Sequence, residues 1–255
     1  MNFLVLLFVL LTSNSAFAGE VIDHVFTSGG YTYKATIMDS FPYPFVTVTS
    51  DKVLLITHNS TYWDREQITW RGTAKLAAFF RQQNFSLFYL ADIQDRAHIA
   101  KENYLPVPIA ANEVYPFQGD THRIIMQGRH VVIAGGNFTV CACQTTRSVI
   151  ALAQTQDLNV HLAMDAIYEG VGGQTLTLKE ISDKLNDEQF LQYLKQDYFN
   201  PDFLPCPEAL LTTNRTFKYR IYRHDKFLGE VGNGTTSVHL YFADSEAVVQ
   251  RLASY

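Results

Sequence analysis

The sequence predicts an α/β fold with a doubly wound, mostly parallel sheet and β-rich additions at both ends. Its middle contains four short apolar runs of strand length, at residues 53–57, 86–90, 130–135 and 160–164. These runs are continuously apolar rather than alternating, which is typical of parallel strands covered on both faces. Stretches with the apolar spacing of helices lie between them, and this alternation indicates βαβ units.

The chain opens with a segment typical of a cleavable secretory signal. Residues 3–11 are all apolar, and they are too few to span a bilayer, which takes about 20 residues. Ala16 and Ala18 supply the small side chains of a cleavage site. We therefore expect residues 1–18 to be removed and the mature chain to be exported, to the periplasm or outside the cell. An uncleaved anchor is the alternative, and the polar residues 12–14 argue against it.

The segment after the signal, residues 19–51, is predicted to be a β-rich N-terminal extension. Residues 24–27, 31–37 and 45–49 are rich in aromatic and β-branched side chains, and glycine or proline residues separate these runs. From residue 52 the sequence changes to continuous apolar runs that alternate with helical spacing. We therefore place the start of the α/β domain there.

The α/β domain is expected to cover residues 52–200. Its apolar spacing predicts helices at residues 70–83, 140–154 and 175–199, and a short helical segment at 122–126. These helices alternate with the four apolar strands.

Residues 201–255 are predicted to form a β-rich C-terminal addition. Prolines at 201, 205 and 207 interrupt the preceding helical pattern. Two β-rich runs then flank His224-Asp225 in the manner of a hairpin, and a strand at 238–242 and a helix at 245–252 complete the chain.

Charge and composition exclude several partner classes. The chain of 255 residues has a formal net charge of −5 and no basic run, so nucleic acid and anionic membrane surfaces are poor partners. No later segment is long and apolar enough to cross a membrane. We expect a small-molecule substrate or ligand, and the sequence leaves the oligomeric state open.

The chain has three cysteines, Cys141, Cys143 and Cys206. This odd number leaves at least one thiol free or paired with another molecule. Cys141 and Cys143 are too close in sequence to bridge easily, whereas either can pair with Cys206. The sequence leaves that choice open.

The stretch from residue 130 to residue 166 carries the clearest chemistry. It predicts a strand ending at Gly135-Gly136, an N-cap at Thr139, and Cys141 in the first helical turn. A thiol there meets the positive end of the helix dipole, which favours the thiolate. We expect backbone N–H groups nearby to hold an oxyanion; the candidate oxyanion or pocket residues are Gly136, Asn137, Thr139 and Val140. The alternative is a cysteine that only fills space, which is the role expected for Cys143.

This stretch resembles the nucleophile region of the isochorismatase-like cysteine hydrolases, a family that includes nicotinamidases. The matching positions are Gly135, Val140, Cys141, Thr145, Arg147, Asp165 and Ala166. Residues 54–58 resemble the family's opening strand, and the likeness extends from residue 52 to about residue 195. It implies an isochorismatase-like sheet in which Cys141 is the nucleophile that attacks a small amide or related C–N bond.

Two positions depart from the family's Asp, Lys and Cys triad. His58 occupies the place of the Asp, and the Lys position falls near Ala111 and Asn112. Either the triad has changed or the fold has lost its original chemistry. A changed triad would pair Cys141 with His58 as base; the alternative is a hydrogen-bonded histidine at a strand end.

The loop after the second apolar strand corresponds to the place where nicotinamidases carry metal ligands. It contains Asp92, Asp95 and His98, but Gln94 replaces an expected histidine. We expect no metal and no cofactor, and we treat Asp92 as a possible pocket residue.

The sequence thus supports two functions. The first is an exported cysteine hydrolase that acts on a small amide or related C–N bond. The alternative is a non-catalytic binding or interaction protein that kept the fold and lost the triad.

Overall fold

The computed structural model describes residues 21–28, 31–38, 46–48, 50–91, 95, 105–109, 113–116, 124–126, 130–152, 158–171, 173–198 and 217–255. Their main feature is an eight-stranded sheet with the strand order β13-β12-β14-β9-β8-β4-β5-β6. From that first edge, the strands are β13 (Lys226–Val231), β12 (Phe217–Arg223), β14 (Thr236–Ala243), β9 (Leu158–Ala163), β8 (His130–Gly135), β4 (Lys52–Thr57), β5 (Ser86–Ala91) and β6 (Val114–Pro116).

All neighbouring strands of this sheet are parallel except the β12–β13 pair. The four strands predicted from continuous apolar runs are β4, β5, β8 and β9. The α/β class and the mostly parallel sheet are therefore confirmed. Both faces of the central strands are buried, which explains why their sequences do not alternate.

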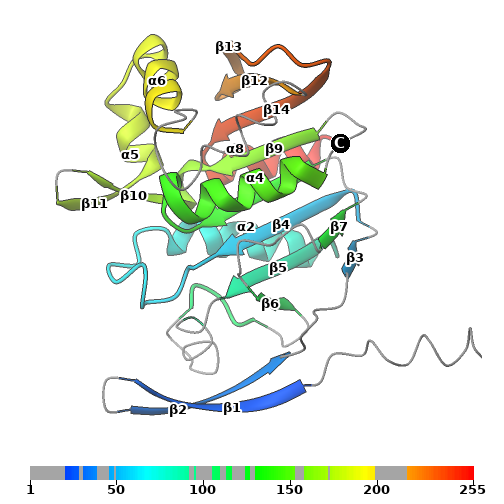
Figure 1. The fold of residues 1–255 in the computed structure, drawn as a ribbon, viewed down its shortest axis with the longest axis vertical. Coiled ribbons are helices and arrows are strands. Elements are labelled where there is room, and N and C mark those ends of the chain that lie inside the picture. The colour runs from blue at the N-terminus through cyan, green and yellow to red at the C-terminus, as the bar shows by residue number, and fades with distance from the viewer. Residues whose placement is uncertain are drawn as a thin grey trace, which may run out of the picture.

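Helices cover both faces of the sheet (Figure 1). One apolar cluster joins β4 residues such as Leu55 to α4 (Cys143–Leu152), α5 (Leu178–Asp183) and α6 (Asp187–Tyr193). A second cluster joins the alternate β4 residues, such as Ile56, to α2 (Trp70–Gln82) and α8 (Ser245–Ala253). Successive residues of one strand thus serve two separate cores.

Two helix predictions were wrong. Residues 124–126 form a strand, β7 (Ile124–Met126), that pairs in parallel with β3 (Val46–Val48). The predicted helix at 175–199 is divided between β11 (Gln174–Thr177), α5, α6 and the π-helical turn η5 (Leu194–Tyr198). Capping boxes at Thr177 and Asn186 start α5 and α6 separately, because each cap satisfies the free N–H groups of a new helix.

The two ends of the chain differ in how they join the sheet. β1 (Val21–Ser28) and β2 (Tyr31–Met38) form a separate antiparallel hairpin, drawn dark blue in Figure 1. The C-terminal hairpin forms as predicted, with His224 and Asp225 at positive φ in its turn. From Phe217 onward the C-terminal strands continue the main sheet, since β14 pairs with β9. The domain boundaries themselves stay predictions.

Asp165 fastens the C-terminal helix to the centre of the fold. Its carboxylate accepts hydrogen bonds from the backbone N–H of Ser245 and from Ser245 Oγ, each at 2.6 Å. A Cβ on Gly72 in α2 would lie 2.9 Å from Asp165 Cγ, so α2 also packs closely here. Asp165 is one of the positions that resemble the isochorismatase-like pattern, and in this structure its carboxylate holds Ser245 at the start of α8.

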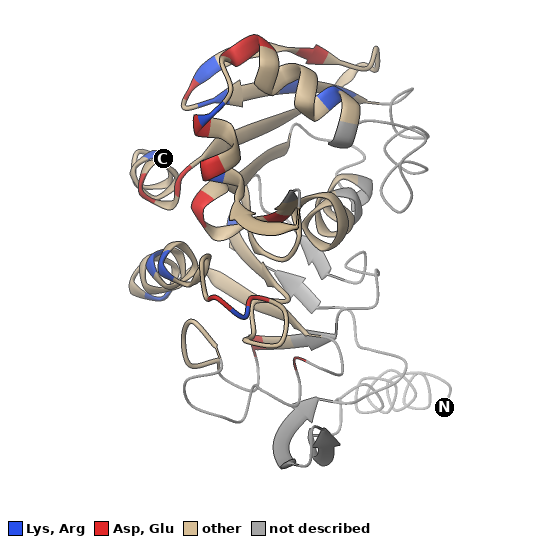
Figure 2. Cartoon of the chain, turned by 90° about the vertical axis from the view of Figure 1, so that its left-hand side faces the viewer, with Lys and Arg blue, Asp and Glu red and all other residues tan. Residues whose placement is uncertain are grey.

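Charged residues lie mainly on helices, turns and the C-terminal hairpin, coloured blue and red in Figure 2. The predicted signal, residues 1–18, lies outside the described residues. Within the part of the chain that is described, no helix has the length and apolar character needed to cross a bilayer.

Candidate active site

The order in which successive strands are added to the sheet reverses between β4 and β8. β5 and β6 follow β4 on one side, whereas β8, β9 and β14 extend the other side. Ligands of open α/β sheets bind beyond the carboxyl ends of the strands at such a point. The residues that follow these strands here are His58 after β4, the Gly135-Gly136 turn after β8, and Asp95 after β5.

Two glycines shape the turn that leads to Cys141. Gly135 and Gly136 have φ values of 73° and 74°, a left-handed conformation that costs glycine little. A Cβ on Gly135 would lie 2.2 Å from the Thr57 carbonyl oxygen, and one on Gly136 would lie 3.1 Å from Cys141 Cβ. The double glycine therefore lets β8 approach β4 and brings the turn close to the thiol.

Cys141 lies in a single π-helical turn, η3 (Phe138–Ala142), directly before α4. The prediction of Thr139 as N-cap was wrong: the N-cap is Asn137, whose side-chain oxygen accepts a bond from the Thr139 N–H. The N-cap moves because the tight glycine turn starts the helical winding two residues earlier. Cys141 still lies in the first turn.

Cys141 is a free cysteine with a half-buried side chain. Cys143 is fully buried and takes part in a disulfide. Cys206 lies outside the described residues. The accessible thiol of the described chain is thus the one at the turn after β8.

His58 connects Cys141 to a carboxylate. Its Nδ1 lies 2.5 Å from Asp95 Oδ2, and the imidazole also makes a side-chain hydrogen bond with Cys141. Burial alone lowers the pKa of His58, but the bonds and charges of Asp95 and Cys141 outweigh it and raise the pKa above the ordinary value of 6.5. The ring is therefore an imidazolium near neutral pH.

The backbone of His58 adopts an unusual conformation. Its φ is 46°, a region that few residues other than glycine occupy and that clusters at functional sites. The His58 N–H bonds to the Leu90 carbonyl at 3.3 Å, which holds the end of β4 against β5. From this strained backbone at the end of β4 the imidazole reaches both Asp95 and Cys141.

The sequence named Asp95 only as part of the loop where the resemblance places metal ligands, and its position beside His58 was not predicted. The side chain is fully buried. Tyr89 OH donates to Asp95 Oδ1 at 3.3 Å, and the Asn59 N–H donates to Tyr89 OH at 3.0 Å. The mixed Asp and His content of residues 91–99 was the signal available. Asp92, the predicted pocket residue, lies outside the described residues.

A buried polar network anchors the loop that follows His58. Asn59 Nδ2 donates to Thr73 Oγ1 at 2.6 Å, and Thr69 Oγ1 donates to both Asn59 Oδ1 and Asp64 Oδ2. Asp64 also accepts the backbone N–H groups of Ile68 and Thr69. The loop is therefore fixed to the start of α2, and Trp63 on it lies with its ring 5.3 Å from the His58 ring.

Glu169 holds the turn that leads to Cys141 through hydrogen bonds. This residue of β10 (Tyr168–Val171) is 8% exposed. Its carboxylate accepts bonds from Asn137 Nδ2 at 2.9 Å, the Thr139 N–H at 2.9 Å and the Gly170 N–H at 2.8 Å. The Thr139 N–H is thereby engaged, and the Asn137 carbonyl oxygen accepts from the Val140 and Ala142 N–H groups at 3.3 and 3.0 Å. Of the N–H groups at positions 139–142, that of Cys141 is therefore the candidate donor to a ligand.

Tyr168 lies within the electrostatic reach of this cluster. Burial raises the pKa of its hydroxyl, and the charges of Cys141, Asp64, Asp95 and Glu169 raise it further. The phenol therefore stays neutral and remains a hydrogen-bond donor. Tyr168 was not predictable from the sequence, because a tyrosine in a short strand carries no distinguishing pattern.

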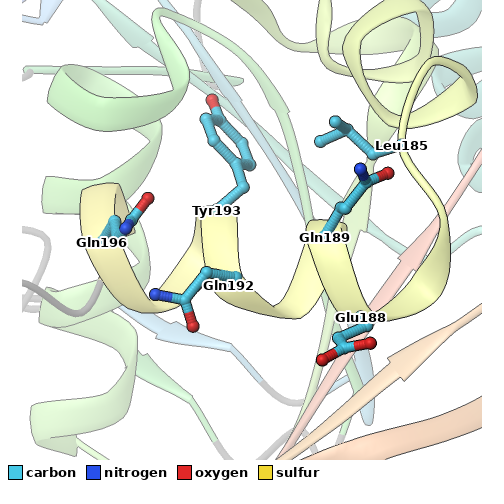
Figure 3. Close-up of a pocket in the computed structure, with 6 residues that line it drawn as sticks. All are labelled: Leu185, Glu188, Gln189, Gln192, Tyr193 and Gln196. Atoms are coloured by element: carbon cyan, nitrogen blue, oxygen red, sulfur yellow. The ribbon is translucent and has the colours of Figure 1, made fainter.

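Among the described residues, no group of three or more His, Cys, Asp or Glu side chains is arranged to hold a metal ion. The residues aligned with the family's Lys, Ala111 and Asn112, and the loop residue His98 lie outside the described part. An open hollow of about 540 Å³ occurs elsewhere, along α6, where Figure 3 shows Gln189, Gln192 and Tyr193. It is separate from Cys141, so the candidate site rests on its side-chain geometry.

Comparisons with known proteins add no family assignment. No family model matches this chain, and no curated protein matches it.

Proposed function

We propose that the protein is an exported cysteine hydrolase that cleaves a small amide or related C–N bond. The observation that carries this proposal is the linear arrangement of Cys141, His58 and Asp95 at the carboxyl ends of β8, β4 and β5. A thiol beside a base, with the base oriented by a third group, is the general signature of nucleophilic catalysis.

The strand order supports the finer assignment to a doubly wound, isochorismatase-like fold. With β12 and β13 set aside, the remaining strands numbered along the chain follow the order 3-2-1-4-5-6. This order is typical of doubly wound sheets, which bind ligands where the order reverses. The proposed triad lies at that reversal, and His58 stands where the resemblance expects the Asp.

The proposed reaction needs no group beyond this chain and water. The Cys141 thiolate attacks the substrate carbonyl carbon, and the backbone N–H of Cys141 in the first helical turn holds the oxyanion. The His58 imidazolium then gives its proton to the leaving nitrogen as the C–N bond breaks. Water attacks the resulting thioester while His58 takes up its proton, the C–S bond then breaks with its electron pair going to sulfur, and the carboxylic acid leaves the restored Cys141 thiolate.

Asp95 acts as a positioning residue in this scheme. With Nδ1 bound to its carboxylate, the imidazole keeps one orientation, and its other nitrogen remains for the thiol and the leaving group. The bond from Tyr89 and the full burial of Asp95 fix that carboxylate in turn.

Export is proposed on the signal-like residues 1–18, and the disulfide at Cys143 supports it, since disulfides persist mainly in oxidising compartments. A mature chain that starts at Gly19, found by intact mass of the protein from its native cell, would agree. A chain that still carries Met1 would overturn this part.

The activity is tested by trapping the acyl enzyme. We expect 4-nitrophenyl acetate to add one acetyl group at Cys141, detected by intact mass and peptide mapping. Cys141→Ala should abolish this adduct, and His58→Ala should slow its formation about 100-fold or more. The enzyme should also release 4-nitroaniline from small 4-nitroanilides. A folded protein whose Cys141 forms no adduct would favour the non-catalytic binding protein instead.

A further inference from the structure

Two exposed aromatic rings lie beside the proposed triad. Tyr62 is 41% exposed and Trp63 is 37% exposed, and their rings meet edge to face at 4.9 Å. The Trp63 ring centroid is 5.3 Å from that of His58. The buried network of Asn59, Asp64 and Thr69 anchors this loop, so Tyr62 and Trp63 stay beside His58. Exposed apolar side chains that form a contiguous surface, as these two rings do, mark ligand or partner contacts more than single ones do.

Three buried carboxylates lie in the neighbourhood of the same thiol. Asp95 is separated from Cys141 by one imidazole ring, Glu169 holds the backbone two residues before Cys141, and Asp64 is adjacent to Trp63 in sequence. The His58 imidazolium is bonded to Asp95, the first of these carboxylates. Each carboxylate, and Cys141 itself, raises the pKa of Tyr168, which places all of them within one electrostatic neighbourhood. Clefts dominated by one sign of charge concentrate ligands of the opposite sign.

We propose that this site selects small cationic amides, with the positive group of the substrate held against the Trp63 ring, and that it excludes substrates carrying a carboxylate. An indole face attracts ammonium groups, most strongly where water is partly excluded. The surrounding carboxylates add to this attraction over a longer range. This inference rests on the proposed function, since it names the substrate class of the same site.

The test uses three methanethiosulfonates with the same reaction and different charge: trimethylammonioethyl, sulfonatoethyl and methyl. In each case the Cys141 thiolate attacks the sulfenyl sulfur, a mixed disulfide forms, and methanesulfinate leaves with the electron pair. Rates at Cys141 are measured by mass mapping of the full chain and divided by the rates for 2-mercaptoethanol. We expect the normalised rate for the cationic reagent to be about ten times that for the anionic reagent, or more.

Three comparisons isolate the cause. In the wild type, the ratio should fall as sodium chloride is raised, because exposed fields are screened over about 10 Å at 0.1 M salt. Trp63→Leu should reduce the cationic rate and leave the methyl reagent unchanged. Glu169→Gln should lower the ratio, whereas the matched change Glu246→Gln, at an exposed carboxylate of α8, should not.

The outcomes separate this inference from the proposed function. A normalised ratio near one, or a ratio that ignores salt, overturns the charge selection while Cys141 remains a nucleophile. A ratio unaffected by Trp63→Leu overturns the role of that ring. Failure of Cys141 to react with any of the three reagents in folded protein overturns the proposed function itself.

Discussion

At the scale of single residues, His58 determines the chemistry. Its bonds to Asp95 and Cys141 keep the imidazole charged despite burial, and a charged imidazole stabilises a neighbouring thiolate. The same two bonds make His58 sensitive to pH in two measurable ways, one in reactivity and one in stability.

The first expectation concerns alkylation of Cys141 by iodoacetamide as a function of pH. His58→Ala removes the positive partner of the thiolate, so alkylation near pH 7 should slow, by about tenfold for each 1.4 kcal/mol of stabilisation that is lost. His224→Ala is the matched control, because His224 is exposed and also has a positive φ of 42°. If the rate of Cys141 alkylation against pH were the same in wild type and His58→Ala, His58 would not be the base.

The second expectation concerns stability. The folded pKa of His58 is raised to about 10 from 6.5. The stabilisation it provides is therefore present in full below pH 6.5 and is lost as the pH rises through about 10. The difference in unfolding free energy between wild type and His58→Ala, measured in urea, should shrink from pH 7 to pH 10.5. A constant difference would mean that His58 is neutral in the fold.

At the scale of elements, the strands buried on both faces were predictable from sequence, whereas helix boundaries and the short strands β7 and β11 were not. The continuous apolar runs identified β4, β5, β8 and β9, because strands buried on both faces leave no polar positions. The division of residues 175–199 was missed because apolar spacing continues across Lys184, while the caps at Thr177 and Asn186 decide where helices begin. Likewise, Cys141 and His58 could be named from strand ends, whereas the partnership of Asp95 depends on how a loop after β5 folds back.

The link between β9 and α8 gives a prediction for an element. Asp165→Ala removes the acceptor of both Ser245 donors in a buried setting, which should lower the unfolding free energy by about 1–3 kcal/mol. Alkylation of Cys141 in the folded variant should be unchanged, since the carboxylate of Asp165 is bonded to Ser245 and not to the triad. Slower alkylation at unchanged stability would instead make Asp165 part of the site.

At the scale of the whole molecule, the C-terminal strands belong to the main sheet. Proline-rich residues 200–207 lie outside the described residues, and from the sequence we expect limited proteolysis to cut there. The two fragments should stay together in native size-exclusion chromatography, because β14 pairs with β9 and α8 lies against α2. They should separate only in urea with reductant. A C-terminal fragment that dissociates under native conditions would make it an accessory unit.

The lateral order of the three strand ends has a consequence for reaction geometry. Cys141, His58 and Asp95 follow β8, β4 and β5, which are adjacent in that order. A bound amide would therefore lie along the sheet edge, with its departing amine toward β4 and its acyl part toward β10. In this single orientation, only one of the two prochiral faces of the carbonyl is presented to the Cys141 sulfur. Substituents on the departing amine would then meet Tyr62 and Trp63, and those on the acyl part would meet Val140 and Tyr168.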